Sequence, residues 1–209
     1  TINAMPPSAA VVLAKKKKVI RAATRMFLEQ GYESMVLDNL VAEVGGSKAF
    51  IYNNFGGKKE LFEESIKQAC NDILEPLAHL DVEKLPLKKG LETLAQGFLK
   101  VSLADDSIAL HRLIVAERLN FPHLGEIFLQ AGPERSYGKV AEFLGRHQQN
   151  GRLKAGDPYD LAVQFLGLVN AGFLLKMLSA GHALPATAVL KARVKSSVGI
   201  FLAGQALDP

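Results

Sequence analysis

LDNLVAEVGGSKAFIYNNF, residues 37–55, consists of two short amphipathic patterns separated by a pair of glycines. The first pattern repeats apolar residues at helical spacing, at Leu37, Leu40, Val41 and Val44. Ser47 can cap a second helix, which carries Phe50, Ile51 and Phe55 on its inner side. The turn between them is short and contains glycine because one residue there usually needs a positive φ. This spacing predicts a helix-turn-helix, although many other helical corners share it.

The outer side of the second helix carries the polar side chains Lys48, Tyr52, Asn53 and Asn54. Such side chains form hydrogen bonds with phosphates and with base edges.

The segments on both sides of this motif are also predicted to be helical. Residues 15–30 repeat apolar residues on one face and stop at Gly31, and a further amphipathic helix starts near Lys58.

Positive charge is concentrated near this segment. The formal net charge is +4, and residues 1–68 account for +3 of it, with 10 Lys and Arg against 7 Asp and Glu. The contributing cations include a run at Lys15, Lys16, Lys17 and Lys18, followed by Arg21, Arg25, Lys48, Lys58 and Lys59. A basic first third suggests a polyanionic partner, nucleic acid first and an anionic membrane surface second. The alternative is that the lysine run is a solvated helix start.

Composition is typical of a folded protein of one medium domain or two small ones, with 209 residues, 48% hydrophobic residues and a single cysteine. Cys70 by itself can form neither an intrachain disulfide nor a cysteine-based zinc site, which favours a reducing compartment. The most apolar stretch, 161–175, is too short to span a bilayer. We see no secretory signal pattern and expect a cytoplasmic protein without a membrane partner.

Helical periodicity continues through the rest of the chain, and no stretch shows the sustained alternation of a strand. Helices are expected over about 87–103, 108–119, 123–131, 133–150, 159–180 and 186–206, with 105–107 as a loop and cap. The predicted fold is all-α. It has an N-terminal three-helix domain over 14–62, which contains the helix-turn-helix, and a larger helical domain over 63–209.

Residues 19–62 resemble the N-terminal domain of the TetR family of bacterial transcriptional regulators. The resemblance rests on Ala22-Ala23 with Phe27, Gly31-Tyr32, Leu40-Val41, Gly45, Ser47-Lys48, Ile51-Tyr52, Phe55, Lys58 and Lys59-Glu60-Leu61-Phe62. Over forty residues in register make this a specific signal.

The resemblance implies a role in DNA binding for several residues. Ser47 and Lys48 would open the recognition helix and contact the phosphate backbone and nearby bases. Tyr52 and Lys58 occupy positions of family phosphate contacts, and Asn54 replaces a histidine that also contacts phosphate. Ala49 and Asn53 face outward on the same helix and are expected to read bases or their methyl groups.

Some residues depart from the family pattern. Met35, Val36 and Leu37 stand where threonines are frequent, so that Ser34 is the remaining candidate cap of the second helix. Gly46 replaces a frequent valine, and Phe50 occupies a position that is often small or polar. We expect Phe55 to pack in the core and Tyr52 both to pack and to contact phosphate. These differences affect the operator sequence more than the class of protein.

Residues 113–172 have a second resemblance, to the C-terminal domain of the AefR-like subgroup of the same family. Its pieces are Ala116-Glu117-Arg118, Phe121-Pro122 with Leu124, Gly132-Pro133, Gly151-Arg152-Leu153, Asp157-Pro158 and Ala162 with Phe165-Leu166-Gly167-Leu168. In the family this domain binds a small molecule and forms a homodimer. Dimer contacts are expected at Leu161, Phe165, Leu168 and Val169, and the alternative is that these helices pack only within one subunit.

Polar residues within the apolar helices are the candidates for binding a small-molecule effector. They are His111, Glu117, Arg118, Tyr137 and Asn170, with Arg112 and His182 as further possibilities. Each of them is also compatible with a structural or surface role, and Glu117-Arg118 with an ion pair that fixes the following bend. Cys70 is a candidate redox sensor or an inert core thiol.

No enzyme motif stands out, the histidines lack metal-ligand spacing, and no cofactor or metal is expected. The predicted function is therefore a homodimeric, ligand-responsive regulator that binds a palindromic double-stranded DNA operator, most readily as a repressor. One alternative is a helical small-molecule-binding protein with little specific DNA binding. The other is a helical enzyme.

Overall fold

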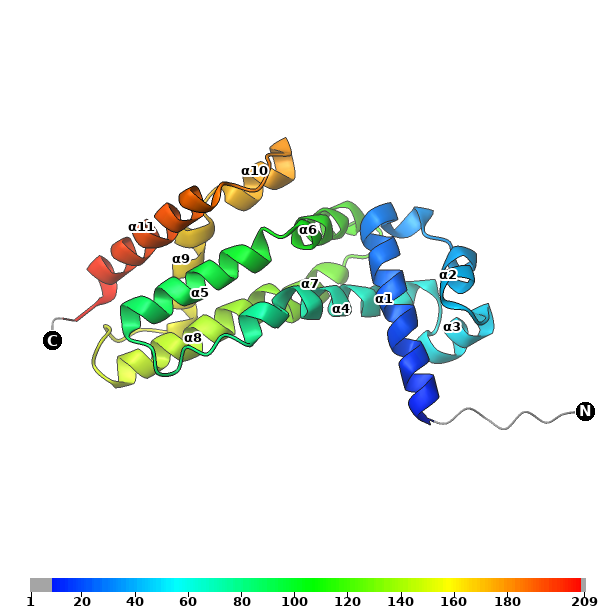
Figure 1. Cartoon of the computed structure of the whole chain (residues 1–209), viewed down its shortest axis with the longest axis horizontal. Helices are drawn as coiled ribbons and strands as arrows, with labels where there is room; N and C mark the ends of the chain where they lie inside the picture. Colours follow the sequence, from blue (N-terminus) through cyan, green and yellow to red (C-terminus); the bar gives the residue numbers. More distant parts are fainter. Residues whose placement is uncertain (1–8, 208–209) are drawn as a thin grey trace, which may run out of the picture.

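The computed structural model describes residues 9–207, and these residues fold into eleven helices (Figure 1). Their bounds are α1 (Ala9–Ser34), α2 (Leu37–Val44), α3 (Lys48–Phe55), α4 (Lys58–Ala78), α5 (Leu87–Ser102), α6 (Asp105–Glu117), α7 (Leu124–Ala131), α8 (Pro133–Gln149), α9 (Pro158–Asn170), α10 (Phe173–Ala180) and α11 (Thr187–Gln205). A single antiparallel bridge joins Leu153 to Ala206. The all-α prediction is confirmed.

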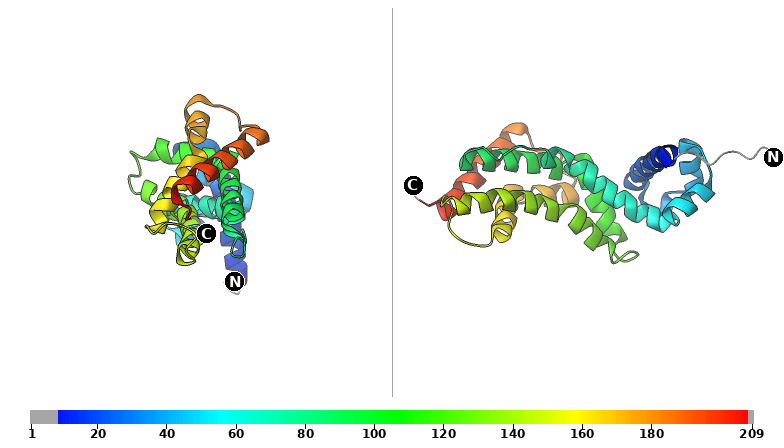
Figure 2. Two further views of the ribbon diagram at one scale, coloured as in Figure 1. Left: turned by 90° about the vertical axis from the view of Figure 1, so that its left-hand side faces the viewer. Right: turned by 90° about the horizontal axis from the view of Figure 1, so that it is seen from below.

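Helices α1, α2 and α3 form a unit at one end of an elongated molecule, and α5, α8, α9 and α11 form a bundle at the other end (Figures 1 and 2). Each end has its own apolar core. The first core includes Phe27, Leu40 and Ile51, all of which are buried. The second includes Phe143 and Phe165. Two cores are consistent with two units that bury apolar surface separately.

Helix α4 links the two ends. Its first half contributes Leu61 and Phe62 to the first core, and its second half buries Leu74 and Leu77 against α5. The helix includes Pro76 and ends two residues later at Ala78. The predicted boundary between residues 62 and 63 falls inside α4, and the division into 14–62 and 63–209 stays a prediction.

Four aromatic rings join the N-terminal unit to the rest of the chain. Phe62 on α4 lies 4.7 Å from Phe27 and 5.0 Å from Tyr32, measured between ring centroids, and both partners belong to α1. Phe121, in the segment between α6 and α7, completes the cluster with its ring centroid 4.5 Å from that of Tyr32. Tilted and edge-on aromatic pairs at these distances are favourable, so the cluster fixes α4 and the α6–α7 segment against α1.

Several predicted boundaries are wrong. The expected helix over 159–180 is two helices that are bent by 56°, because Gly172 adopts a left-handed conformation with φ 79°. Helix α6 starts at Asp105, so 105–107 is its first turn rather than a loop. Helix α1 starts at Ala9 and continues for a turn beyond a kink at Gly31.

The expected cap of α2 is also different. The residue at the N-cap position is Val36, not Ser34, and it contributes no side-chain hydrogen bond. Its carbonyl oxygen accepts from the backbone N–H groups of Asn39 and Leu40 at 3.1 and 3.3 Å. Helix α2 therefore depends on packing rather than on a polar cap for its N-terminus.

Within residues 9–207, no single helix has the length and apolar composition needed to cross a bilayer. The pair α9 and α10 reaches the required length only together, across the 56° bend.

Close packing of α5 on α8 generates a first prediction. A Cβ at Gly90 of α5 would overlap the ring of Phe143, which is fully buried, whereas a Cβ at Gly138 of α8 meets nothing within 4 Å. We expect Gly90→Ala to lower the free energy of unfolding by about 1–3 kcal/mol through overpacking. The control, Gly138→Ala, should raise it by about 0.5–1 kcal/mol because alanine favours helix. Urea unfolding followed by circular dichroism measures both, and equal stabilisation by the two variants would contradict the close contact.

Candidate nucleic-acid interface and ligand cavity

The turn between α2 and α3 requires its two glycines. Gly45 has φ 76° and Gly46 has φ 123°, values that other residues rarely adopt. The Gly45 N–H donates to the Val41 carbonyl oxygen at 2.9 Å and so closes α2. The turn is thus short because both of its residues take conformations that redirect the chain at once.

Helix α3 is held by one polar cap and one apolar anchor. Ser47 is the N-cap as predicted, and its Oγ accepts from the Phe50 N–H at 3.3 Å. Ile51 is fully buried, and Phe50 and Phe55 are half-buried against the same core. These contacts turn the other side of the helix outward.

The exposed side of α3 carries most of the predicted DNA-binding residues. Ser47, Lys48, Ala49 and Asn53 are exposed, and Tyr52 has 54% of its surface accessible. Asn54 is half-buried, and its Nδ2 donates to the Phe50 carbonyl oxygen at 2.8 Å. The structure therefore places five of the seven predicted residues together on one free face, with Asn54 partly used inside the helix.

Two predicted phosphate-binding cations have partners within the chain. Lys48 Nζ lies 2.8 Å from Asp38 Oδ1 of α2, and this hydrogen bond raises the pKa of Lys48. Lys58 Nζ lies 4.4 Å from the centroid of the Tyr32 ring and donates to the Glu33 carbonyl oxygen at 3.3 Å. Lys58 is the first residue of α4, and its side chain therefore packs against the last residues of α1.

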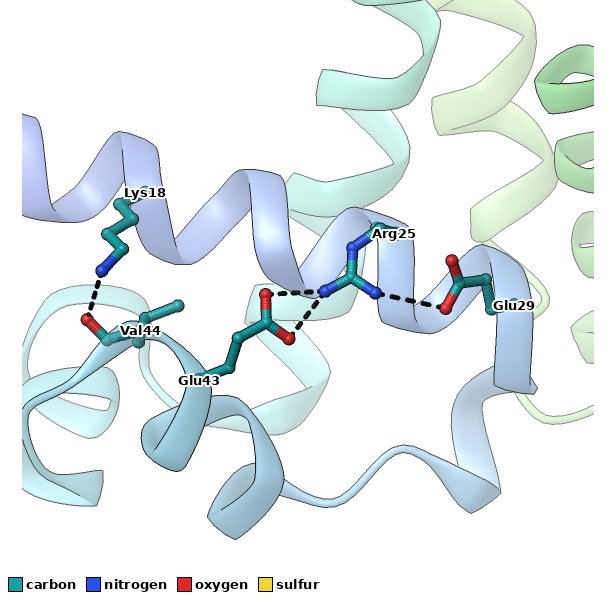
Figure 3. Close-up of polar contacts among 5 residues, drawn as sticks. All are labelled: Lys18, Arg25, Glu29, Glu43 and Val44. Atoms are coloured by element: carbon teal, nitrogen blue, oxygen red, sulfur yellow. Dashed lines mark hydrogen bonds and ion pairs between the residues drawn. The ribbon is translucent and has the colours of Figure 1, made fainter.

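Part of the basic run on α1 braces the motif (Figure 3). Lys18 Nζ donates to the Val44 carbonyl oxygen at 2.8 Å, which satisfies an open carbonyl at the end of α2. Arg25 Nη2 donates to both carboxylate oxygens of Glu43 at 2.6 Å, and Nη1 donates to Glu29 at 3.3 Å.

Of the remaining cations of α1, one has a partner within the chain and three have no salt bridge among the described residues. Lys15 Nζ lies 4.6 Å from the centroid of the Phe50 ring. Lys16, Lys17 and Arg21 form no salt bridge within residues 9–207. Lys15 and Lys18 thus have partners within the chain, which neither the polyanion prediction nor the solvated alternative included. Whether Lys16, Lys17 and Arg21 bind a polyanion stays a prediction.

A cavity of about 110 Å³ lies in the larger helical part, between helices α4 to α10. It brings together three of the five predicted ligand-binding residues, His111 of α6, Tyr137 of α8 and Asn170 of α9. The remaining lining residues are Cys70, Ile73, Leu74, Phe98, Val101, Ser102, Ser107, Leu110, Phe128, Gly132, Pro133, Ser136 and Leu174. A mostly apolar wall with a few polar groups is typical of a small-molecule site.

Two polar atoms in the cavity wall are buried without a partner among the described residues, Ser102 Oγ and Asn170 Oδ1. The sequence analysis missed Ser102, although a serine between the apolar residues Val101 and Leu103 is a usable signal. His111 Nδ1 lies 2.7 Å from the Ser107 carbonyl oxygen, which only accepts, so this nitrogen carries the proton. Burial lowers the pKa of His111 and raises the pKa of Tyr137, so both side chains stay neutral near pH 7.

The other ligand candidates lie outside this cavity. Glu117 is buried and accepts from Asn120 Nδ2 at 3.1 Å, and Arg118 is exposed. Arg112 Nη2 donates to the Met177 carbonyl oxygen at 3.2 Å, and His182 is exposed. The structure thus does not bring these four residues to the cavity.

Three of the four predicted dimer residues face the chain's own core. Leu161, Phe165 and Val169 are buried in the second core, whereas Leu168 has 37% of its surface exposed. For these three residues, the structure agrees with the alternative that the helices pack within one subunit. Further apolar side chains are exposed on the outer faces of α9 and α11, at Val163, Val189 and Ile200.

Cys70 is buried in the wall of the cavity, and burial raises the pKa of its thiol to about 11. The thiolate is the reactive form, so this cysteine is protected from oxidation in the folded chain. The reading as an inert core thiol therefore fits better than a redox sensor.

Comparison with known proteins agrees with this arrangement. Residues 19–65 match the sequence model for bacterial regulatory proteins of the TetR family, and residues 89–204 match the model for the C-terminal domain of AefR-like transcriptional repressors. The negative transcriptional regulator IcaR of the biofilm operon in Staphylococcus aureus is 35% identical over 69 residues. That match covers 33% of this chain and 37% of IcaR, so the chain spans little more than a third of this curated relative.

Two solved structures are similar over nearly the whole chain. A TetR-family transcriptional regulator from Mesorhizobium loti has a TM-score of 0.85 at 28% identity, and the match covers 94% of this chain and 98% of that one. The flavonoid-responsive regulator FrrA has a TM-score of 0.80 at 29% identity, with 94% and 99% covered. Both resemblances drawn from the sequence are confirmed.

The Asp38–Lys48 pair generates a prediction on DNA affinity. Asp38→Asn removes the carboxylate that competes with phosphate for Lys48, so we expect binding to a random duplex at low salt to tighten roughly two- to fivefold, the strength of one exposed ion pair. Fluorescence anisotropy measures the affinity, with Asp106→Asn, at an exposed position in the first turn of α6, as the charge-matched control. Weaker binding by Asp38→Asn would instead show that Asp38 orients Lys48 for its contact.

Burial of His111 generates a prediction on pH. Because its pKa is lowered by burial, the unfolded chain binds more protons than the folded chain below the ordinary histidine value of 6.5. The neutral ring therefore contributes its full share to the free energy of unfolding above pH 6.5, and this contribution is lost as the pH falls. We expect His111→Phe to reduce the loss of unfolding free energy between pH 7.5 and 5.5 in urea titrations. His182→Gln, at an exposed position, controls for the loss of a histidine, and an unchanged pH profile in His111→Phe would contradict the assignment.

Proposed function

The chain belongs to the TetR family of transcriptional regulators, and on that premise we propose that it is a repressor which a small-molecule effector releases from a palindromic DNA operator. The observation that carries the proposal is the free polar face of α3, held outward by the Ser47 cap and the buried Ile51. A helix of this kind in a helix-turn-helix enters the major groove. The name of IcaR, a negative regulator, supports the repressor role. The proposed location in the bacterial cytoplasm follows from the DNA partner.

On DNA, some residues of the exposed face would contact phosphates and others would contact bases. Tyr52 and Ser47 would position the helix on phosphates, and Ala49 and Asn53 face outward where base edges lie. Lys48 would exchange Asp38 for a phosphate, and Lys58 would have to leave the Glu33 carbonyl oxygen. Lys16, Lys17 and Arg21 add charge that makes binding dependent on salt.

A homodimer would supply the two-fold symmetry that a palindromic operator requires. Its interface is proposed on the outward faces of α9 and α11. Exposed Val163 and Leu168 on α9 accompany exposed Val189 and Ile200 on α11. Glycines at 167 and 199 lie on the same exposed faces and leave room for close approach of a partner helix.

The cavity is proposed as the effector site because its walls connect to the DNA-binding unit. Helix α4 lines the cavity with Cys70 and Leu74 and packs in the first core with Phe62. Helix α6 lines it with Leu110, and one turn later Leu113 packs in the first core. An effector with higher affinity for one arrangement of α4 and α6 would shift the population of that arrangement and with it the position of α3. The name of FrrA, a flavonoid-responsive regulator, supports a ligand-responsive role.

A second candidate function is a small-molecule-binding protein with little specific DNA binding. The observation that favours it is that Lys48, Asn54 and Lys58 all have partners inside the chain. Each of those contacts would be lost or exchanged on DNA, which reduces the net gain from binding.

Selection of random duplexes on the purified full chain tests both candidates. We expect a two-fold symmetric motif, and we expect Tyr52→Ala and Lys48→Ala to weaken binding to it, with the salt slope reduced by about one for Lys48→Ala. Lys88→Ala, an exposed lysine of α5, is the matched control, and light scattering verifies the dimer. Absence of any enriched motif from an intact dimer would favour the second candidate.

A further inference from the structure

The cavity that α4 to α10 line is unfavourable for a charged ligand. None of its lining residues is Asp, Glu, Lys or Arg, and its one histidine is kept neutral by burial. The cations that follow on α8 are engaged elsewhere, since Arg135 donates to Asn71 and Lys139 Nζ donates to the Ala78 carbonyl oxygen at 2.9 Å. An ionised ligand would therefore be buried without a counter-charge, at a large cost in free energy.

Some polar atoms of the cavity wall lack a hydrogen-bond partner within the described residues, and one of them, the Ser102 hydroxyl, can both donate and accept. Asn170 Oδ1 and Ser102 Oγ are buried and have no partner within the described residues. His111 donates its Nδ1 proton to the Ser107 carbonyl oxygen, which leaves Nε2 as the accepting nitrogen of the ring. Buried polar atoms of native proteins are normally hydrogen-bonded, and Asn170 Oδ1 and His111 Nε2 can only accept, so these two atoms indicate a ligand that donates a hydrogen bond.

The size and walls of the cavity restrict the rest of the ligand. Phe98, Phe128 and Tyr137 contribute aromatic surface, and the His111 ring stands edge-on to Phe128 at 5.0 Å between centroids. The volume of about 110 Å³ is of the same order as an apolar cavity that accepts benzene. One ring fills such a space and packs favourably against aromatic walls.

We propose that the cavity binds an uncharged, single-ring molecule that carries a hydroxyl donor, of the phenol type, and that this group hydrogen-bonds to Asn170, Ser102 or His111. The inference rests on the proposed function, since it names the chemical class of the effector for the same cavity. It concerns binding to the cavity itself, which can be measured without DNA.

Isothermal titration calorimetry of the full chain with phenol, toluene and benzoate tests the proposal. Toluene has a similar shape without the hydroxyl, and benzoate carries a negative charge. We expect phenol to bind about three- to tenfold more tightly than toluene, as one hydrogen bond to a buried acceptor predicts, and benzoate to bind more weakly than either.

Variants assign the binding to the cavity. Asn170→Leu, Ser102→Ala and His111→Phe each remove one acceptor, and at least one of them should abolish the preference for phenol while toluene still binds. Gln149→Leu, at an exposed position at the end of α8 outside the cavity, is the matched control and should keep the preference. Unfolding of each variant in urea verifies that it folds.

Three outcomes would overturn the proposal: toluene binding as tightly as phenol, benzoate binding more tightly than phenol, or no binding of any of the three. A preference for phenol that survives all three cavity variants would overturn it as well. Because the calorimetry uses no DNA, these outcomes are distinct from failure of the proposed regulator, which the duplex selection detects.

Discussion

The rest of the structure depends on helix α4, because this one helix is buried in two cores. Phe62 packs against Phe27 and Tyr32 near its beginning, and Leu74 and Leu77 pack against α5 near its end. A helix fixed at both ends transmits displacement as a rigid element, since packed side chains leave little room for bending. Helix α4 thus joins the unit that contains α3 (Figure 1) to the wall of the cavity, which it lines with Cys70 and Leu74.

Positive charge serves two purposes in the N-terminal unit. Lys18 and Arg25 close the motif from α1 by binding a carbonyl at the end of α2 and the carboxylate of Glu43. Lys16, Lys17 and Arg21 have no salt-bridge partner in residues 9–207, and phosphate contacts are proposed for them. A count of charges does not separate these roles, because the separation depends on which face of α1 lies against α2.

Much of the fold could be predicted from the sequence because the apolar residues of an amphipathic helix recur with the period of the helix. The α2 and α3 bounds, the Ser47 cap and the glycine turn follow from residues close together in the chain. Where prediction failed, the signal was weaker or competed with another. The helix expected over 159–180 is broken at Gly172, whose left-handed backbone the apolar periodicity does not reveal.

The sequence by itself determined the all-helical class, the helix-turn-helix and the family, because these depend on local periodicity and on motifs in register. Only the tertiary structure decided which residues share a cavity. His111, Tyr137 and Asn170 meet there with Ser102, whereas Glu117 and Arg118 do not. It also decided that Leu161, Phe165 and Val169 face inward and Leu168 outward. The physical reason is that an apolar helix such as α9 has more than one face that could be buried, and only its packing partners select one.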